Sequence, residues 1–390
     1  MNINNLVPNI GIMKNGNENN INSLNEDNLN QSQILHNKTK RNNYSKEEDI
    51  NNSFPDIQLL KDLSIPSYID DFFGSLDNTF IVFKSSNEII HLIFSNKDRS
   101  IIDYNLIDFK LINEIKMAHF RLITNFRHYY DSNNRIDLII SISSIDNNIK
   151  LWNTNNWDCL YNFLNLNKSG TLFSGCFLND NNNNYILTSN FNILKKVENI
   201  KIFDFNGNKM KEIKDSNFNT YFIDCYYDKK LSKNFIITGN SDIIRSYDYN
   251  NNEIYKKYYE KRGWLNAYFS IIVYKDDTDN DNNIKLVSSS FEGCIKIFNF
   301  HTGMLLKKIE KNDTKFFGIC FWNHQYLFCG SKEGSIYMAD IINGEFVKNI
   351  KVSDCDIITL KIILHPFYGL CMISQEVLFG GIKIWINKPK

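Results

Sequence analysis

The sequence lacks the features that mark a membrane, secreted or nucleic-acid-binding protein. The charges of its 44 basic and 44 acidic residues cancel. The chain therefore lacks the net positive charge that supplies most of the affinity of proteins for nucleic acid. No run reaches the roughly 18 apolar residues that a membrane-spanning helix needs. The first residues also show no basic start followed by an apolar stretch. We therefore expect no secretory leader, no membrane span and no nucleic-acid partner.

Paired cysteine motifs are also missing. The eight cysteines are spread one or two per repeat, without a CxxC spacing and without clustered histidines. Cysteines scattered in strands are typical of small core side chains in a reducing compartment. We therefore expect a cytoplasmic or nuclear protein and favour this interpretation over disulfides or a zinc site. The cysteines are residues 159, 176, 225, 294, 320, 329, 355 and 371.

Catalytic motifs are absent as well. None of the seven histidines stands in a His-x-x-x-His or His-Glu-x-x-His spacing. The glycine-rich stretch 170–175 lacks the lysine of a phosphate loop and the serine placement of a nucleophile elbow. We expect no enzyme, no cofactor and no small-molecule substrate, and a propeller enzyme is the least favoured alternative.

What the sequence does contain is a short motif that recurs at regular intervals. In each copy a basic or polar residue precedes an aromatic or large side chain. The steps between terminal positions are 48, 51, 44, 51, 41 and 46 residues, close to the roughly 40 to 45 residues of a four-stranded propeller blade. Such units cannot bury a core alone and must stack on their neighbours. The copies are Asn148–Trp152, Asn199–Phe203, Ile243–Tyr247, Cys294–Phe298 and Gly381–Trp385, with looser ones ending at Tyr104 and Ala339.

Composition changes near residue 54. Residues 1–53 are rich in asparagine with scattered apolar residues, and this composition predicts a disordered tail. A short docking motif around Ile34-Leu35 is the alternative interpretation of part of it. Residues 54–390 consist of short β-branched and aromatic runs separated by polar turns, with few alanines and no long amphipathic helix. We expect one all-β domain there.

One unit illustrates the expected strand pattern. It starts with an inner strand over 122–128 and a polar loop over 131–137. A second strand, a turn and a third strand follow, and an outer strand ends the unit. In the third strand Ile149 and Leu151 alternate with Lys150 and Trp152, so its two faces meet different environments. The last four elements cover residues 138–143, 144–148, 149–153 and 159–163.

These repeats resemble the WD40 family. Second strands end in small residues, as in Ser141-Ile142-Ser143, before an acidic or Asn/Gly turn and a third strand that ends near Trp or Phe. Few of the family's signature residues are present, and Asn153, for example, stands where the family has aspartate. The resemblance implies a His–Ser–Asp chain that braces each blade. Here His119, Asp146 and Ser141 or Ser143 are the residues that could form it.

The chain ends predict how the ring closes. The last recognisable third strand covers 382–387 and is followed by three residues, so its blade lacks an outer strand. The resemblance implies closure by a strand from the other terminus, and 56–60 is a suitable extended segment. We expect seven four-stranded antiparallel blades. In the first blade, either 69–73 or 80–84 could be the inner strand.

The expected function is a non-catalytic scaffold that docks a partner protein or peptide on one rim. The longest polar inserts, over 131–137, 179–184 and 276–283, all join first to second strands. Because flexible polar loops offer few anchors, we expect the partner on the opposite rim. The alternative is a subunit of a ubiquitin-ligase or chromatin complex that recognises a substrate or modified peptide. The expected partner-binding residues are Phe120, Arg121, Phe218, Trp264, Leu265, Lys315 and Phe316.

Overall fold

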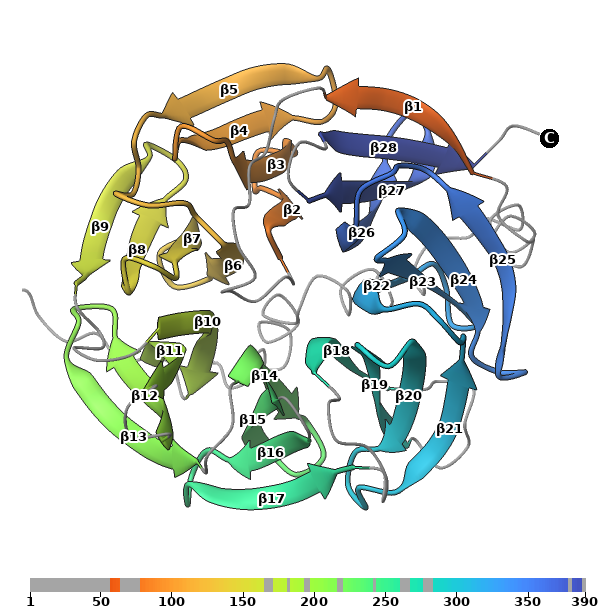
Figure 1. Cartoon of the computed structure of the whole chain (residues 1–390). Helices are drawn as coiled ribbons and strands as arrows, with labels where there is room; N and C mark the ends of the chain where they lie inside the picture. The colour runs from red at the N-terminus through yellow and green to blue at the C-terminus, as the bar shows by residue number, and fades with distance from the viewer. Residues whose placement is uncertain are drawn as a thin grey trace, which may run out of the picture.

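The structure is a computed structural model that forms seven four-stranded antiparallel sheets. Figure 1 shows these sheets as blades around a central axis. The predicted all-β, seven-bladed propeller is confirmed. The predicted tail, 1–53, lies outside the described residues. The described residues are 57–63, 78–164, 171–180, 183–192, 197–215, 220–240, 243–259, 267–275, 283–377 and 381–387.

Each blade runs from an inner strand near the axis to an outer strand at the edge. Blades 1 to 3 consist of β2 (Phe80–Lys84), β3 (Ile90–Ser95), β4 (Ile101–Asn105) and β5 (Lys110–Ile115); β6 (Asn125–Asp131), β7 (Ile136–Ser143), β8 (Asn148–Asn153) and β9 (Asp158–Phe163); and β10 (Thr171–Asp180), β11 (Asn183–Asn192), β12 (Val197–Asp204) and β13 (Lys209–Asp215). Blades 4 to 6 consist of β14 (Thr220–Asp228), β15 (Lys233–Asn240), β16 (Ile244–Asp248) and β17 (Glu253–Tyr258); β18 (Tyr268–Lys275), β19 (Ile284–Ser290), β20 (Cys294–Asn299) and β21 (Leu305–Glu310); and β22 (Phe316–Phe321), β23 (Tyr326–Ser331), β24 (Ser335–Asp340) and β25 (Glu345–Lys351). Blade 7 consists of β26 (Ile357–His365), β27 (Gly369–Glu376), β28 (Ile382–Asn387) and β1 (Ile57–Leu63).

The core lies between neighbouring blades, because the two faces of each strand pack on different partners. In β8, Ile149 and Leu151 contribute to the cluster shared with blade 3. Trp152 points the other way, into the cluster shared with blade 1. The alternation predicted for this strand is thereby observed. The inner strand is shifted to β6, beyond the expected 122–128, because Ile123 fills the core from the preceding linker instead.

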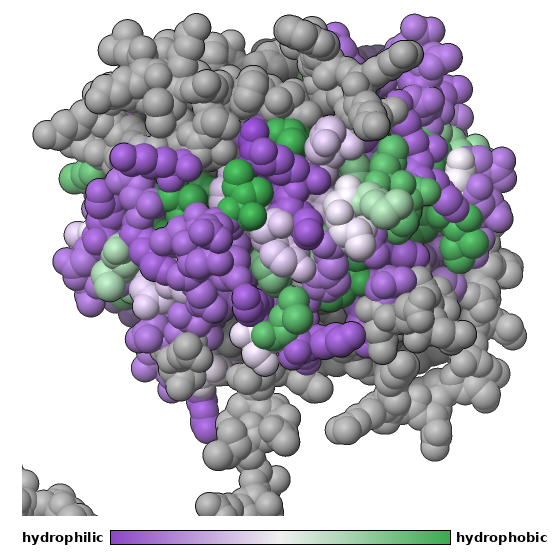
Figure 2. All heavy atoms as spheres, turned by 90° about the horizontal axis from the view of Figure 1, so that it is seen from below, coloured by the Kyte–Doolittle hydropathy of each residue, from purple (hydrophilic) through white to green (hydrophobic). Residues whose placement is uncertain are grey.

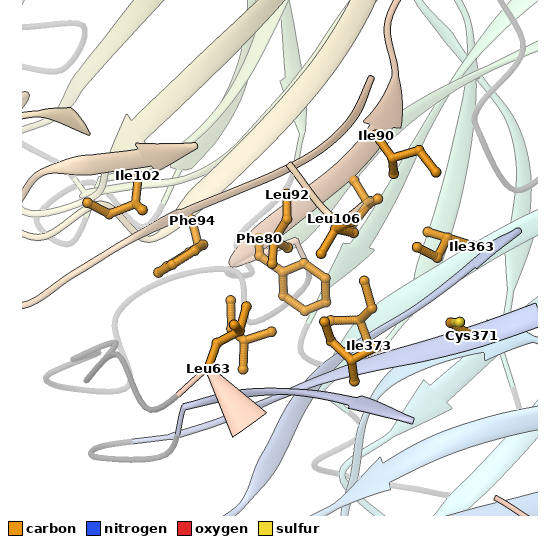
Figure 3. Close-up of a cluster of buried hydrophobic side chains, with 13 residues drawn as sticks. Leu63, Phe80, Ile90, Leu92, Phe94, Ile102, Leu106, Ile363, Cys371 and Ile373 are labelled. Carbon is orange, nitrogen blue, oxygen red and sulfur yellow. The ribbon is translucent and has the colours of Figure 1, made fainter. Parts of the chain in front are cut away.

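The ring closes between the two ends of the chain. β1 pairs antiparallel with β28, with Ile57 opposite Asn387 and Leu63 opposite Ile382. The predicted closing strand at 56–60 is confirmed with shifted bounds. Figure 3 shows Leu63 beside Phe80 of blade 1 in the cluster that joins blades 7 and 1. The inner strand of blade 1 is β2, and the alternative segment 69–73 lies outside the described residues.

Antiparallel pairing places alternate connections on opposite faces of the ring. The linker face carries the connections that enter inner strands and the turns from second to third strands. In blade 2 these are residues 116–124 and 144–147. The hairpin face carries the first-to-second hairpins and the third-to-outer turns. In blades 2 and 7 the hairpins are residues 132–135 and 366–368.

The polar inserts on the hairpin face differ from the expected loops. In 131–137 the connection is 132–135, whereas all described residues of 179–184 belong to strands. Asn184 accepts a hydrogen bond from the Tyr129 hydroxyl at 2.6 Å and from the Asn179 amide at 2.7 Å. The amide side chains of the insert 179–184 therefore bond to Tyr129 of blade 2, and the expectation that these loops offer a partner few anchors stays a prediction. Most of the third insert lies outside the described residues.

Candidate binding face

The linker that enters blade 2 is fixed by hydrogen bonds from three directions. The Ala118 amide donates to the Arg99 carbonyl at 2.9 Å, and Arg99 Nη1 donates to the Phe120 carbonyl at 2.8 Å. The Arg121 amide donates to Asp146 Oδ2 at 2.6 Å. Lys150 Nζ donates to the Ala118 carbonyl at 2.6 Å. These bonds order the linker before any partner arrives.

This clamped linker presents an exposed aromatic side chain. Phe120 is 73% exposed, and Met117 on the same linker is 64% exposed. Ile145, in the turn that Asp146 ties to the linker, is 51% exposed. The Arg121 guanidinium lies 5.5 Å from the Phe120 ring centroid. The predicted residues Phe120 and Arg121 therefore lie together on the linker face, in an apolar patch with a positive neighbour.

A buried polar chain lies beneath this linker. His119 Nε2 lies 2.7 Å from Ser141 Oγ, which accepts a hydrogen bond from Trp152 Nε1 at 2.8 Å. Burial, followed by the nearby charge of Lys150, lowers the pKa of His119 to about 3. The expected partnership of His119 and Ser141 is observed. Asp146 is not part of this chain, because its carboxylate bonds the Arg121 amide and Ser143 Oγ.

The other expected partner-binding residues are not gathered at this patch. Lys315 lies at the start of blade 6, and its ammonium is 3.8 Å from the centroid of the Phe291 ring. Phe316 is fully buried in the cluster between blades 5 and 6, so its proposed surface role is not supported. The reason is its position as the first residue of β22, where the side chain packs inward. Phe218, Trp264 and Leu265 lie outside the described residues.

Sequence reasoning missed an aromatic arc at the start of the inner strands. In blades 3 to 7 each inner strand has a register shift near its first residues, typical of a β-bulge. The residues at these shifts are Phe173, Tyr221, Phe269, Phe317 and Ile358. The first four follow one another at intervals of 48 residues. That spacing is the signal that could have revealed them.

Neighbouring rings of the arc touch across the blades. The centroid distances are 5.5 Å for Phe173–Tyr221, 5.3 Å for Tyr221–Phe269 and 5.8 Å for Phe269–Phe317. Ile358 packs with Phe317 in the same buried cluster. Most of the arc is buried, so it packs the inner strands of adjacent blades together on the linker-face side. Phe120, which belongs to a different sector, is the more accessible aromatic.

A second exposed aromatic lies on the hairpin face of blade 7. Phe367 is 73% exposed, and Leu364 and Tyr368 beside it in sequence are 60% and 43% exposed. The Phe367 amide donates to His365 Nδ1 at 3.1 Å, and His365 Nε2 lies 3.0 Å from the Leu106 carbonyl. This apolar hairpin was missed because the other inserts on that face are polar. It is the rival docking position.

The edge of the ring on the side of β17 is mostly hydrophilic, and its hydrophobic patches are separate (Figure 2). Across the described ranges, no group of three or more His, Cys, Asp or Glu side chains is placed to hold a metal ion. No helix in that part of the chain is long and apolar enough to cross a membrane.

Comparisons with known proteins establish the fold of this chain but not its family. No family model and no curated protein matches the sequence. Among solved structures, the crystal structure of BBS1N in complex with ARL6DN, soaked with lead, is similar with a TM-score of 0.62 and 9% identity. The similarity covers 86% of this chain and 98% of that chain. At this identity it shows a shared propeller fold, and that propeller is one that forms a complex with another protein.

Proposed function

We propose that the chain is a non-catalytic scaffold of the WD40 type, cytoplasmic or nuclear, that docks a partner protein or peptide on its linker face. The observation that carries this proposal is Phe120, an exposed aromatic side chain on a linker fixed by hydrogen bonds. Exposed aromatic and arginine side chains are the usual anchors of protein interfaces. A linker ordered in advance also loses little conformational entropy on binding.

The positive charges on the linker favour a partner segment that carries a carboxylate. Arg121 lies beside the Phe120 ring, and Lys116 is exposed on the same linker. A partner segment with an apolar side chain next to a carboxylate fits this patch best, because the apolar group covers Phe120 and the carboxylate pairs with Arg121. The WD40 assignment is supported by the repeat period and by the His119–Ser141–Trp152 chain.

The test is a comparison of two phenylalanines. The full chain carries an affinity tag and is incubated with native lysate from its own cells, and captured proteins are identified. Phe120→Ala is compared with Phe367→Ala, since both side chains are 73% exposed. Phe120→Ala should weaken capture of the partner by about 2 kcal/mol, roughly 30-fold in affinity, whereas Phe367→Ala should capture it as the wild type does.

Both variants should melt like the wild type, because neither removes a buried group. Capture that depends on Phe367 and not on Phe120 would move the docking site to the hairpin face. Capture unaffected by either substitution would contradict the proposed patch. Recovery of ubiquitin-ligase subunits or histones would favour the alternative function, recognition of a substrate or modified peptide.

A further inference from the structure

Two cysteines of neighbouring blades meet beside the axis of the propeller. Cys176 lies on β10, the inner strand of blade 3, and Cys225 lies on β14, the inner strand of blade 4. Figure 1 shows these two strands next to each other. The Sγ atoms are 3.5 Å apart, although the residues are 49 positions apart in sequence. Both thiols are free.

We propose that Cys176 and Cys225 are an oxidation site that forms a disulfide between blades 3 and 4. A disulfide requires the two sulfur atoms to close to about 2.05 Å. From 3.5 Å this needs a shift of about 1.5 Å, which side-chain rotation of two cysteines on adjacent strands supplies in part. The inferred site goes beyond the proposed scaffold function and does not depend on it.

The surroundings assign different roles to the two thiols. Cys176 is 1% exposed and belongs to the apolar cluster between blades 3 and 4. Cys225 is half-buried and packs against the same cluster. A small-molecule disulfide therefore reaches Cys225 first. Cys176 Sγ lies 3.5 Å from Cys225 Sγ, close enough to attack it once Cys225 has reacted.

The reaction proceeds by thiol–disulfide exchange with a low-molecular-mass disulfide such as oxidised glutathione. The Cys225 thiolate attacks one sulfur of the small molecule, whose S–S bond breaks and releases one thiolate. Cys176 then loses its proton and attacks Cys225 Sγ, which expels the second small thiolate. In total, two protein thiols are oxidised, one small disulfide is reduced to two thiols, and the two protein protons end on those thiols.

The same surroundings make the reaction slow. Burial and then the neighbouring Cys176 thiol raise the pKa of Cys225, with Asp224 acting in the same direction and Arg127 against it. Because the thiolate is the attacking species, little of Cys225 is reactive at neutral pH. The pair therefore stays reduced in a reducing cytoplasm and closes under sustained oxidation.

The experiment oxidises the folded, fully reduced full-length protein with oxidised glutathione, followed by peptide mapping without reduction. A Cys176–Cys225 linked peptide should accumulate, and the melting temperature should rise by about 5 °C, because the bond closes a long loop in the unfolded chain. Cys176→Ala and Cys225→Ala should each abolish both changes. Cys320→Ala, which removes a buried thiol from the inner strand of blade 6, should abolish neither.

Mapping of the wild type gives a decisive result even if a variant folds poorly. A wild type that yields only glutathionylated Cys225, or only a link between Cys320 and Cys329 of blade 6, would overturn the proposal. So would a Cys176–Cys225 link that forms only when denaturant is present, since the native contact would then play no part.

Discussion

Blade 2 and blade 7 share the same internal bracing but are assembled differently. In each, a buried tryptophan at the end of the third strand donates to a buried serine on the second strand at 2.8 Å, from Trp152 to Ser141 and from Trp385 to Ser374. In each, a lysine of the third strand donates to a carbonyl of the preceding linker. The repeat motif read from the sequence therefore encodes one set of contacts twice.

The two blades differ in what completes this set. Blade 2 is one continuous segment, and His119 from its linker joins the serine. Blade 7 takes its outer strand from the other end of the chain, and its lysine, Lys383, also forms an ion pair with the buried carboxylate of Glu376 at 2.5 Å. The same strand motif is therefore completed by a histidine in blade 2 and by a glutamate in blade 7. We expect blade 7 to be the place where the ring opens, and blade 2 to be the more sensitive to acid.

The largest expected effect is at the closure. Deleting residues 54–62 removes most of β1, exposes the edge of β28 and removes Leu60 from the surroundings of the Leu63 cluster. An open sheet edge promotes aggregation. This variant should lose its cooperative melting transition and aggregate, as measured by calorimetry and light scattering.

Deleting residues 1–50 is the control, and it should melt like the full chain because β1 stays intact. Equal melting of the two truncated proteins would show that blade 7 does not need its borrowed strand, and would remove the main difference between the blades.

The next effect tests what the blades share. Trp152 and Trp385 are 5% and 7% exposed and make equivalent hydrogen bonds. Trp152→Ala and Trp385→Ala should each reduce the free energy of unfolding by about 3 to 5 kcal/mol, because each leaves a cavity and removes a buried hydrogen bond to a serine. Urea denaturation measures both. A cost below about 1 kcal/mol in only one blade would mean that the shared motif is not equally important.

A smaller effect distinguishes the blades by pH. His119 has a folded-state pKa of about 3 against an ordinary value of 6.5. Its contribution is complete above pH 6.5 and is lost as pH falls toward 3, because the unfolded chain binds a proton that the folded chain does not. The wild type should therefore lose about 2 kcal/mol more than His119→Gln between pH 7.5 and pH 5.

The measurement is urea denaturation of both proteins at the two pH values. In the matched control, Lys383→Met in blade 7 should leave the acid sensitivity due to His119 in place. Parallel loss of stability in the wild type and His119→Gln would show that His119 does not make blade 2 sensitive to acid.

The smallest effect concerns thiols. Cys159 on the outer strand of blade 2 is exposed, whereas Cys371 in blade 7 is buried. Under native, reduced conditions Cys159 should react quickly with a thiol reagent and Cys371 slowly, and fewer than half of the eight cysteines should react. Reducing agent should not lower the melting temperature of freshly reduced protein. Mass spectrometry after timed labelling provides the check, and rapid labelling of Cys371 would indicate that blade 7 opens readily.

The sequence by itself determined the all-β class, the number of blades and the closing segment. These features follow from local alternation and from a regular period, both written along one chain. The extended segment 56–60 was predicted to complete the blade of the repeat ending at Trp385, and β1 does pair with β28 of that blade.

Only the tertiary structure decided which side chains are accessible and which meet across blades. Phe120 and Phe316 both stand near the start of an inner strand, yet one is 73% exposed and the other fully buried. Local sequence does not separate them, because exposure depends on where the strand begins and on the linker bonds to Arg99 and Asp146. The contact between Cys176 and Cys225 depends in the same way on the packing of blade 3 against blade 4, which sets their inner strands side by side although no short-range pattern links the two cysteines.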